Sequence, residues 1–244
     1  MICVRDSLET PQLPASLVRR PQVAVRPVRV ADRPDAAFAR FAPRRSLFYR
    51  VPKRAIDIVG AACLIVFLSP VMLGTLAILL FTTKGKPLYR QRRLGLLGRP
   101  FWMVKFRTMV PDAERYRDLV ENEVNGPVFK NRRDPRITRF GKILRKFSID
   151  ETPQLFNVLA GTMSLVGPRS PIPGEVDLYE PWQCERLSVK PGLTCIWQVE
   201  GRCDVPFLDW VRMDIRYARS RRLATDLAIL LKTPWAVITG KGAY

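Results

Sequence analysis

The longest apolar stretch of the chain runs from Ile58 to Phe81 without a charged residue, and Ser69-Pro70 stands at its middle. A helix of roughly 20 apolar residues is long enough to cross a bilayer. Proline inside a helix removes a backbone donor and clashes with the preceding turn. The pattern therefore predicts a membrane helix with a break near its centre, where the Ser69 hydroxyl can hydrogen-bond a freed carbonyl.

Basic residues flank this apolar stretch on both sides. They are Arg44, Arg45, Arg50, Lys53 and Arg54 before it, and Lys84, Lys86, Arg90, Arg92 and Arg93 after it. Because positive charge beside a membrane segment marks its cytoplasmic end, a straight crossing would leave one group on the wrong side. A re-entrant hairpin over 49–84, which dips into the membrane and returns, places both groups on the same side. A kinked spanning helix and a buried core helix are the alternatives. A cleaved signal peptide is excluded because the stretch begins far from Met1.

The remainder of the chain carries shorter patterns. Apolar and aromatic residues predict two strands, at 87–89 and 101–106, around a turn at 95–98. Helical spacing and helix-end signals predict helices over 112–124, 137–147, 153–159, 207–217 and 223–231. The expected fold class is α+β and helix-rich, with a small β element. Amphipathic helices, together with Trp235, are expected at the membrane interface.

Composition narrows the range of functions. Residues 1–48 are rich in proline and arginine and are expected to form a disordered basic arm, which leaves 85–244 as the globular domain. The 244 residues carry a formal net charge of +19. This charge suits nucleic acid, anionic lipid or phosphate-bearing substrates, and the apolar stretch favours the last two. The five cysteines include no C-x-x-C pair, which fits a reducing cytoplasmic setting. No histidine is present, so Ser-His-Asp and Cys-His mechanisms are excluded.

The main candidate for chemistry is the adjacent pair Asp150 and Glu151, at the start of the helix expected over 153–159. A helix start attracts anions through its unpaired N–H groups. Two neighbouring carboxylates can share Mg²⁺, which prefers oxygen ligands and usually retains substrate phosphates. The cationic side chains that would complete a phosphate-binding surface are Lys105, Arg107, Arg145, Lys146 and Arg169.

The same residues also have ordinary explanations. The segment from Ser148 to Glu151 fits the S-x-x-E capping box, in which the carboxylates would only cap a helix. Lys105 and Arg107 would form the solvated face of a strand. Arg169 follows a Gly-Pro turn that holds its backbone rigid, although such turns are common. Spacing does not decide between these interpretations, because a cap and a catalytic group are compatible.

Several ordered segments resemble one known family. They are KRAIDIVGA at 53–61, RQRRLGLLGRPFWMVKFRTM at 90–109, DPRITRFGKILRKFSIDETPQLFNVLAGTMSLVGPRS at 134–170, RLSVKPGLTCIWQVEGR at 186–202 and the terminal GKGAY. Together they resemble the bacterial polyprenyl-phosphate sugar-1-phosphate transferases, the small monotopic phosphoglycosyl transferases. The resemblance covers 53–244, and so many matches in order make a chance resemblance improbable.

The resemblance implies a specific activity. A hexose-1-phosphate would pass from a UDP-sugar to undecaprenyl phosphate with release of UMP, at the cytoplasmic face of the bacterial inner membrane, as the first membrane step of exopolysaccharide biosynthesis. In this family the mechanism is ping-pong, so Asp150 would be the nucleophile that carries the phosphosugar, and Glu151, with Asp150, would hold Mg²⁺. The family's phosphate-binding positions fall on Lys105, Arg107, Arg145, Pro168 and Arg169. Ser69-Pro70 takes the place of the break in the family's re-entrant helix.

Two positions depart from the family pattern. Thr152 replaces the leucine of D-E-L-P-Q, and it is expected to serve harmlessly as an N-cap of the following helix. Ser170 replaces the second proline of G-P-R-P. This change is expected to loosen the turn around Arg169 unless Pro171 compensates.

Two rival functions remain open. One is a non-catalytic membrane scaffold for polysaccharide assembly, in which the acidic pair is only a cap. The other is a nucleic-acid-binding module, for which the chain offers no recognised motif. The sequence does not identify the sugar or the polysaccharide, and it leaves open whether the protein forms a homodimer.

Overall fold

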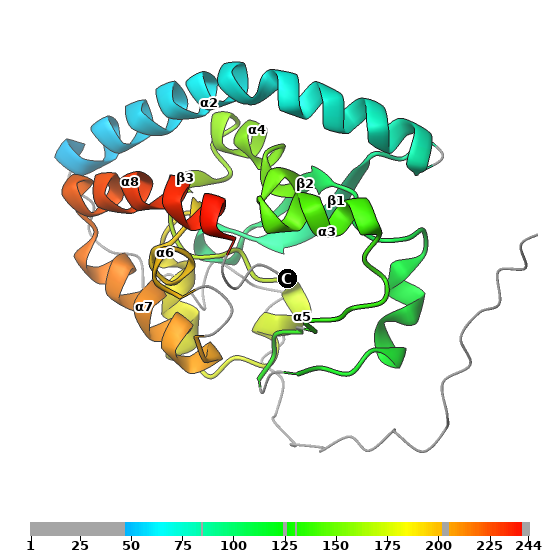
Figure 1. Cartoon of the computed structure of the whole chain (residues 1–244). Coiled ribbons are helices and arrows are strands. Elements are labelled where there is room, and N and C mark those ends of the chain that lie inside the picture. Colours follow the sequence, from blue (N-terminus) through cyan, green and yellow to red (C-terminus); the bar gives the residue numbers. More distant parts are fainter. Residues whose placement is uncertain (1–46, 84, 124–125, 130, 202–204, 241–244) are drawn as a thin grey trace, which may run out of the picture.

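A computed structural model describes residues 47–83, 85–123, 126–129, 131–201 and 205–240. Almost all of the basic segment at 1–48 lies outside the described residues, as do Lys84 and residues 241–244. The described part is a helix-rich α+β fold with two small sheets, as the sequence predicts. Figure 1 shows one long helix lying across a domain made of the shorter elements.

The long helix is α2 (Leu47–Thr82), and among the described residues it is the one helix long and apolar enough to cross a membrane. It continues through Pro70, so the interruption predicted at Ser69-Pro70 does not occur. Proline offers no N–H to the carbonyl of Val66, four residues earlier. That carbonyl instead accepts a 2.7 Å hydrogen bond from the Ser69 hydroxyl, as predicted for a carbonyl freed by the proline. The helix therefore bends without breaking, and Figure 1 shows its two halves inclined to each other.

Both halves of α2 pack against the same domain. In the first half, Ala61 is fully buried in an apolar cluster with Leu155 of α4 (Gln154–Leu159). In the second half, Leu79 is buried in a cluster with Phe106 and Leu144. The opposite face of the helix exposes apolar side chains that include Val59, Val66, Phe67, Leu73 and Phe81. The helix thus has one face for the domain and one open apolar face.

Lys53, predicted as part of the membrane flank, is buried where α2 meets the domain. Its ammonium group lies 3.1 Å from Asp57 and 3.6 Å from Asp226 of α8 (Leu223–Thr239). Asp57 also accepts hydrogen bonds from the Ser164 hydroxyl and the Leu165 N–H, each 3.0 Å long. Charged groups are tolerated inside a protein only with such partners. This cluster therefore seats the beginning of α2 on the domain.

Arg54 is also used inside the fold. Its guanidinium donates two 2.7 Å hydrogen bonds, to the carbonyls of Val158 and Leu159. The last carbonyls of a helix have no partner within the helix, so Arg54 caps the end of α4. Gly161 follows with φ of 80°, the left-handed conformation that glycine commonly adopts just beyond a helix.

The predicted hairpin is confirmed and is longer than expected. Strand β1 (Leu88–Leu94) pairs antiparallel with β2 (Pro100–Phe106), so that Leu88 faces Phe106 and Leu94 faces Pro100. A second sheet pairs β3 (Ser164–Val166) in parallel with β4 (Gly192–Thr194). Strands of three residues are too short to show a periodic pattern, which explains why the sequence did not predict them.

The other helices have these bounds: the 3₁₀ segments η3 (Leu96–Gly98), η4 (Ala113–Leu119), η5 (Ile149–Glu151) and η6 (Gln183–Ser188), and the α-helices α3 (Arg139–Lys146), α5 (Pro173–Val176), α6 (Ile196–Glu200) and α7 (Phe207–Ser220). The helices predicted over 137–147, 207–217 and 223–231 are confirmed as α3, α7 and α8. The helix predicted over 112–124 is a shorter 3₁₀ segment. Buried Trp197 of α6 stacks on Trp210 of α7 with ring centroids 4.5 Å apart, which holds these helices together.

Candidate active site

The acidic pair lies on a tight turn between α3 and α4. Ser148 opens the turn with φ of 54°, and Asp150 and Glu151 form the last two positions of η5. Asp150 is only 6% exposed. Its burial, together with the neighbouring charge of Glu151, raises the pKa of the Asp150 carboxyl to about 6. A buried carboxylate beside a second carboxylate is common at functional sites.

The capping interpretation of this segment is wrong. The Ser148 side chain makes no capping hydrogen bond, and its backbone is left-handed, which is not the conformation of an N-cap. Thr152 is not an N-cap either, because its hydroxyl donates to the carbonyl of Ile149 at 2.8 Å and Pro153 occupies the position before α4. The acidic pair therefore does not belong to a capping box.

A cavity of about 30 Å³ opens beside the pair. The residues that line it are Arg93, Met103, Lys105, Glu151, Gln154, Arg169, Ser170, Gly192, Leu193 and Gln198. Three cationic side chains and one carboxylate thus meet around a space close in size to a single water or small ion. Such a cavity, rich in positive charge, is suited to the oxygens of a phosphate group.

Two of the predicted cations lie close to Asp150. Lys105 lines the cavity, and its burial, reinforced by the nearby charges of Arg93 and Arg145, lowers the pKa of the Lys105 ammonium to about 8. The charge of Asp150 acts in the opposite direction and favours the charged amine. Arg145 lies on α3, and its burial lowers the pKa of the guanidinium although the Asp150 carboxylate opposes that shift.

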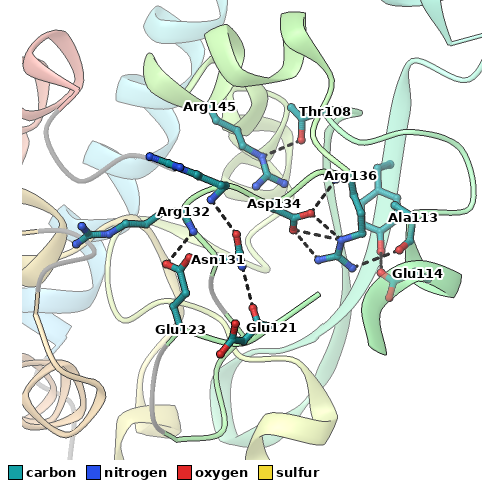
Figure 2. A network of polar contacts seen from close by, with 12 residues as sticks. Thr108, Ala113, Glu114, Glu121, Glu123, Asn131, Arg132, Asp134, Arg136 and Arg145 are labelled. Carbon is teal, nitrogen blue, oxygen red and sulfur yellow. Dashed lines mark hydrogen bonds and ion pairs between the residues drawn. The ribbon is translucent and has the colours of Figure 1, made fainter. Parts of the chain in front are cut away.

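Arg145 is held from behind by a polar network. Its Nε donates to the Thr108 hydroxyl at 3.0 Å, and Figure 2 shows this contact beside the ion pair of Asp134 and Arg136. Arg136 donates to both Asp134 oxygens and to the carbonyl of Ala113. The negative charge of Asp134 acts on Arg145 as well. The segment from Asp134 to Arg136 thus lies next to Arg145 and adds a negative charge beside it.

The structure does not bring every predicted cation to the cavity. Arg107 turns back onto the chain, where its Nε donates to the carbonyl of Lys86 at 2.7 Å. Lys146 is exposed, with its ammonium 5.5 Å from the centre of the Phe147 ring. Neither side chain is among those that line the cavity.

One buried cation of the cavity is not predicted by the sequence. The sequence predicts Arg93 as part of a membrane flank, but its guanidinium is buried and donates to the carbonyl of Ser170 at 2.8 Å. Its burial and the charge of Arg169 lower the pKa of Arg93 to about 10. No sequence signal separates Arg93 from its neighbours Arg90 and Arg92, because only the register of the hairpin decides which one turns inward.

The turn that carries Arg169 is held by hydrogen bonds along its backbone. The Pro168 carbonyl accepts from the Gly192 N–H, the Ser170 carbonyl accepts from Arg93, and the Pro171 carbonyl accepts from the Leu94 N–H. Gly192 must be glycine, since a Cβ there would lie 2.0 Å from the Gly167 nitrogen. The turn predicted to be loosened by Ser170 is thus held by its neighbours.

The donor set fits a magnesium ion of the kind that binds mainly through water and substrate. Asp150 and Glu151 provide adjacent carboxylate oxygens, which Mg²⁺ prefers. In the described part of the chain, no group of three or more His, Cys, Asp or Glu side chains forms a complete metal cage. A two-carboxylate site beside a phosphate cavity needs no such cage, because phosphate oxygens and waters fill the remaining positions.

Comparison with known proteins gives the family. Residues 48–240, most of the chain and all of the site, match the model of the bacterial sugar transferases. The chain belongs to this family. This sugar transferase is 41% identical to the galactosyl transferase CpsE of Streptococcus agalactiae. The match covers 79% of the present chain and 43% of CpsE. It is 37% identical to the exopolysaccharide production protein ExoY of Rhizobium meliloti, over 79% of its length and 88% of that protein.

A third relative carries a more explicit name. The undecaprenyl-phosphate galactose phosphotransferase of Salmonella typhimurium is 40% identical over 80% of this sugar transferase and 42% of that protein. The chain therefore spans less than half of two of these relatives and most of ExoY. The resemblance found in the sequence is confirmed at the level of the family.

Proposed function

We propose that this sugar transferase moves a hexose-1-phosphate from a UDP-sugar to undecaprenyl phosphate. Two relatives are named for undecaprenyl-phosphate galactose and glucose phosphate transfer. The single observation that carries the proposal is a buried Asp150 beside a cavity lined by Lys105, Arg93 and Arg169. Both substrates carry phosphates, so a site of this kind would concentrate them and offset their charge repulsion.

The chemistry proceeds in two displacements. An Asp150 oxygen attacks the phosphorus that bears the sugar, an O–P bond forms, and the bond to the bridging oxygen breaks, so that UMP leaves. An oxygen of undecaprenyl phosphate then attacks the same phosphorus and releases the Asp150 carboxylate. Neither step requires a proton to be removed from the nucleophile, which suits a chain without histidine.

Each residue of the site has a distinct task in this scheme. Lys105 and Arg169 bind the phosphate oxygens, and Arg145 keeps the Asp150 region positive. Glu151 and Asp150 would hold Mg²⁺, which supplies charge neutralisation on the diphosphate when bound. Burial of Asp150 removes water from the nucleophile, which strengthens every electrostatic contact around it.

We also propose that the protein acts at the cytoplasmic face of the inner membrane. The exposed apolar face of α2 would enter the lipid, and because both of its halves pack on one domain, the helix would return to the side from which it entered. Helix α8 adds an exposed apolar stripe with helical spacing, made of Leu227, Leu231, Trp235 and Ile238. Trp235 would sit among the lipid headgroups, where tryptophan is enriched.

The test is an assay of the purified full chain with undecaprenyl phosphate and either UDP-galactose or UDP-glucose, with and without Mg²⁺. We expect UMP release that depends on Mg²⁺ and is lost in Asp150→Asn. Asp112→Asn is the matched control, since Asp112 is exposed and its left-handed backbone accepts asparagine. Full activity of Asp150→Asn would refute the nucleophile, and no UMP release from any UDP-sugar would refute the transferase proposal.

A further inference from the structure

Besides Arg93, a second arginine, Arg186, hydrogen-bonds the backbone of the Arg169 turn, and this arginine does not line the cavity. Arg186 of η6 is 3% exposed, and its Nη2 donates to the Arg169 carbonyl at 3.2 Å. The same Nη2 pairs with the carboxylate of Asp214 on α7, and Nη1 donates to the Tyr179 hydroxyl at 2.8 Å. One guanidinium thus ties the turn to α7 and to the segment after α5.

The turn is held at two successive carbonyls by two different guanidiniums. Arg186 binds the carbonyl of Arg169, and Arg93 binds the carbonyl of Ser170. Fixing two neighbouring peptide groups fixes the direction in which the Arg169 side chain leaves the backbone. No proline stands at position 170 to restrict this turn, so the hydrogen bonds take over that restriction.

We propose that Arg186, held by Asp214, is a positioning residue that aims Arg169 into the phosphate cavity. Arg186 is absent from the residues that line the cavity, so its effect on a bound phosphate has to pass through Arg169. The cost of burying the pair also suggests a purpose beyond stability. A buried ion pair is on balance a weak source of stability, whereas small errors in the position of a binding group reduce function strongly.

This inference deepens the proposed function, since it concerns how the same cavity recognises phosphate, but it can be tested by binding alone. Inorganic diphosphate is the probe, and its affinity for the full chain is measured by calorimetry. Arg186→Lys keeps the charge but loses the planar fork that reaches three partners at once. We expect this variant to weaken diphosphate binding about tenfold, as for the loss of one charge-assisted hydrogen bond.

The decisive comparison is a double-mutant cycle with Arg169→Ala. If Arg186 acts through Arg169, then Arg186→Lys will change diphosphate affinity by less than about twofold once Arg169 is alanine. Asp214→Asn, which keeps the shape of the carboxylate, should show the same non-additivity and serves as a second variant if Arg186→Lys does not fold. Arg219→Lys is the control, because Arg219 joins the same two elements through Glu185 at the surface.

Equal losses in both backgrounds would overturn the proposal, because they would mean that Arg186 only stabilises the fold. Undiminished binding in both variants, or no diphosphate binding by the unmodified protein, would overturn it as well. Failure of the proposed function has a different signature, namely diphosphate binding without UMP release from any UDP-sugar. If the protein is active, the same cycle can be measured on kcat/KM. Arg186→Lys should lower kcat/KM about 10- to 100-fold when Arg169 is present, and should have no such effect when Arg169 is alanine.

Discussion

At the scale of single residues, burial decides which charges take part in the site. Lys105, Arg107 and Arg145 are indistinguishable as charges in the sequence, yet one lines the cavity, one turns back onto Lys86 and one stands against Thr108. The difference matters most for Lys105, whose pKa is lowered to about 8 by burial and by the neighbouring arginines. An ammonium with this pKa is mostly charged at pH 7 and mostly neutral at pH 9.

If Lys105 binds phosphate as proposed, the activity should decline as the pH rises through about 8, where its ammonium group loses its positive charge. Lys105→Arg should retain activity at high pH, because an arginine side chain stays protonated. The measurement is the rate of UMP release from pH 6 to 10 for both proteins, in the same buffers. An alkaline limb that is identical in the two proteins would mean that another group causes it.

At the scale of elements, the long apolar helix α2 and the turn that carries the acidic pair are connected through α4. Asp150 and Glu151 immediately precede α4, and Arg54 of α2 binds the carbonyls at its far end. A cation at the end of a helix also interacts favourably with the helix dipole. The position of the acidic pair thus depends on a residue that the sequence predicts only as part of a basic flank.

Arg54→Ala should lower the free energy of unfolding by about 1–3 kcal/mol, as expected when hydrogen bonds from a charged group to buried carbonyls are lost. The measurement is urea or thermal unfolding in detergent micelles. Arg50→Ala is the control, because Arg50 lies one turn earlier on the same helix and is exposed. A change of less than about 0.5 kcal/mol for both variants would show that the cap contributes nothing.

How far the sequence predicts the protein also differs from element to element. The apolar stretch, the hairpin and helices α7 and α8 carry strong periodic patterns, and they are found close to where those patterns place them. The break predicted at Ser69-Pro70 is absent, because the Ser69 hydroxyl satisfies the carbonyl that the proline frees and the helix continues through Pro70. The pairing of β3 with β4 was also hidden, since strands of three residues carry no pattern.

The sequence also predicts only some of the residues of the candidate site. Asp150, Glu151, Lys105 and Arg169 could be named from motifs along the chain, and three of these four line the cavity. Arg93 and Arg186 could not, because their roles depend on hydrogen bonds to carbonyls that are distant in sequence. Contacts between a side chain and a distant backbone leave no trace in the sequence of either partner.

At the scale of the whole molecule, the arching course of α2 leads to a prediction about topology. Because both of its halves pack on one domain, residues 50 and 86 should face the same side of the membrane. Arg50→Cys and Lys86→Cys, each in a chain without its native cysteines, should both react with an impermeant thiol reagent in inside-out vesicles and neither in intact spheroplasts. Labelling of the two from opposite sides would identify a spanning helix.

The buried cluster around Asp226 determines whether α2 can be separated from the rest of the protein. Asp226 is 0% exposed, and it relies on Lys53 and on the Tyr49 hydroxyl, which donates to it at 2.9 Å. Removing α2 to obtain a water-soluble enzyme would take the Lys53 ammonium and the Tyr49 hydroxyl away from the buried Asp226 carboxylate, which would keep its hydrogen bond from the Tyr217 hydroxyl, and would uncover α4. Helix α2 and the domain that it packs against therefore form one folding unit. We expect that neither could be exchanged for its counterpart from another protein without a change in the other.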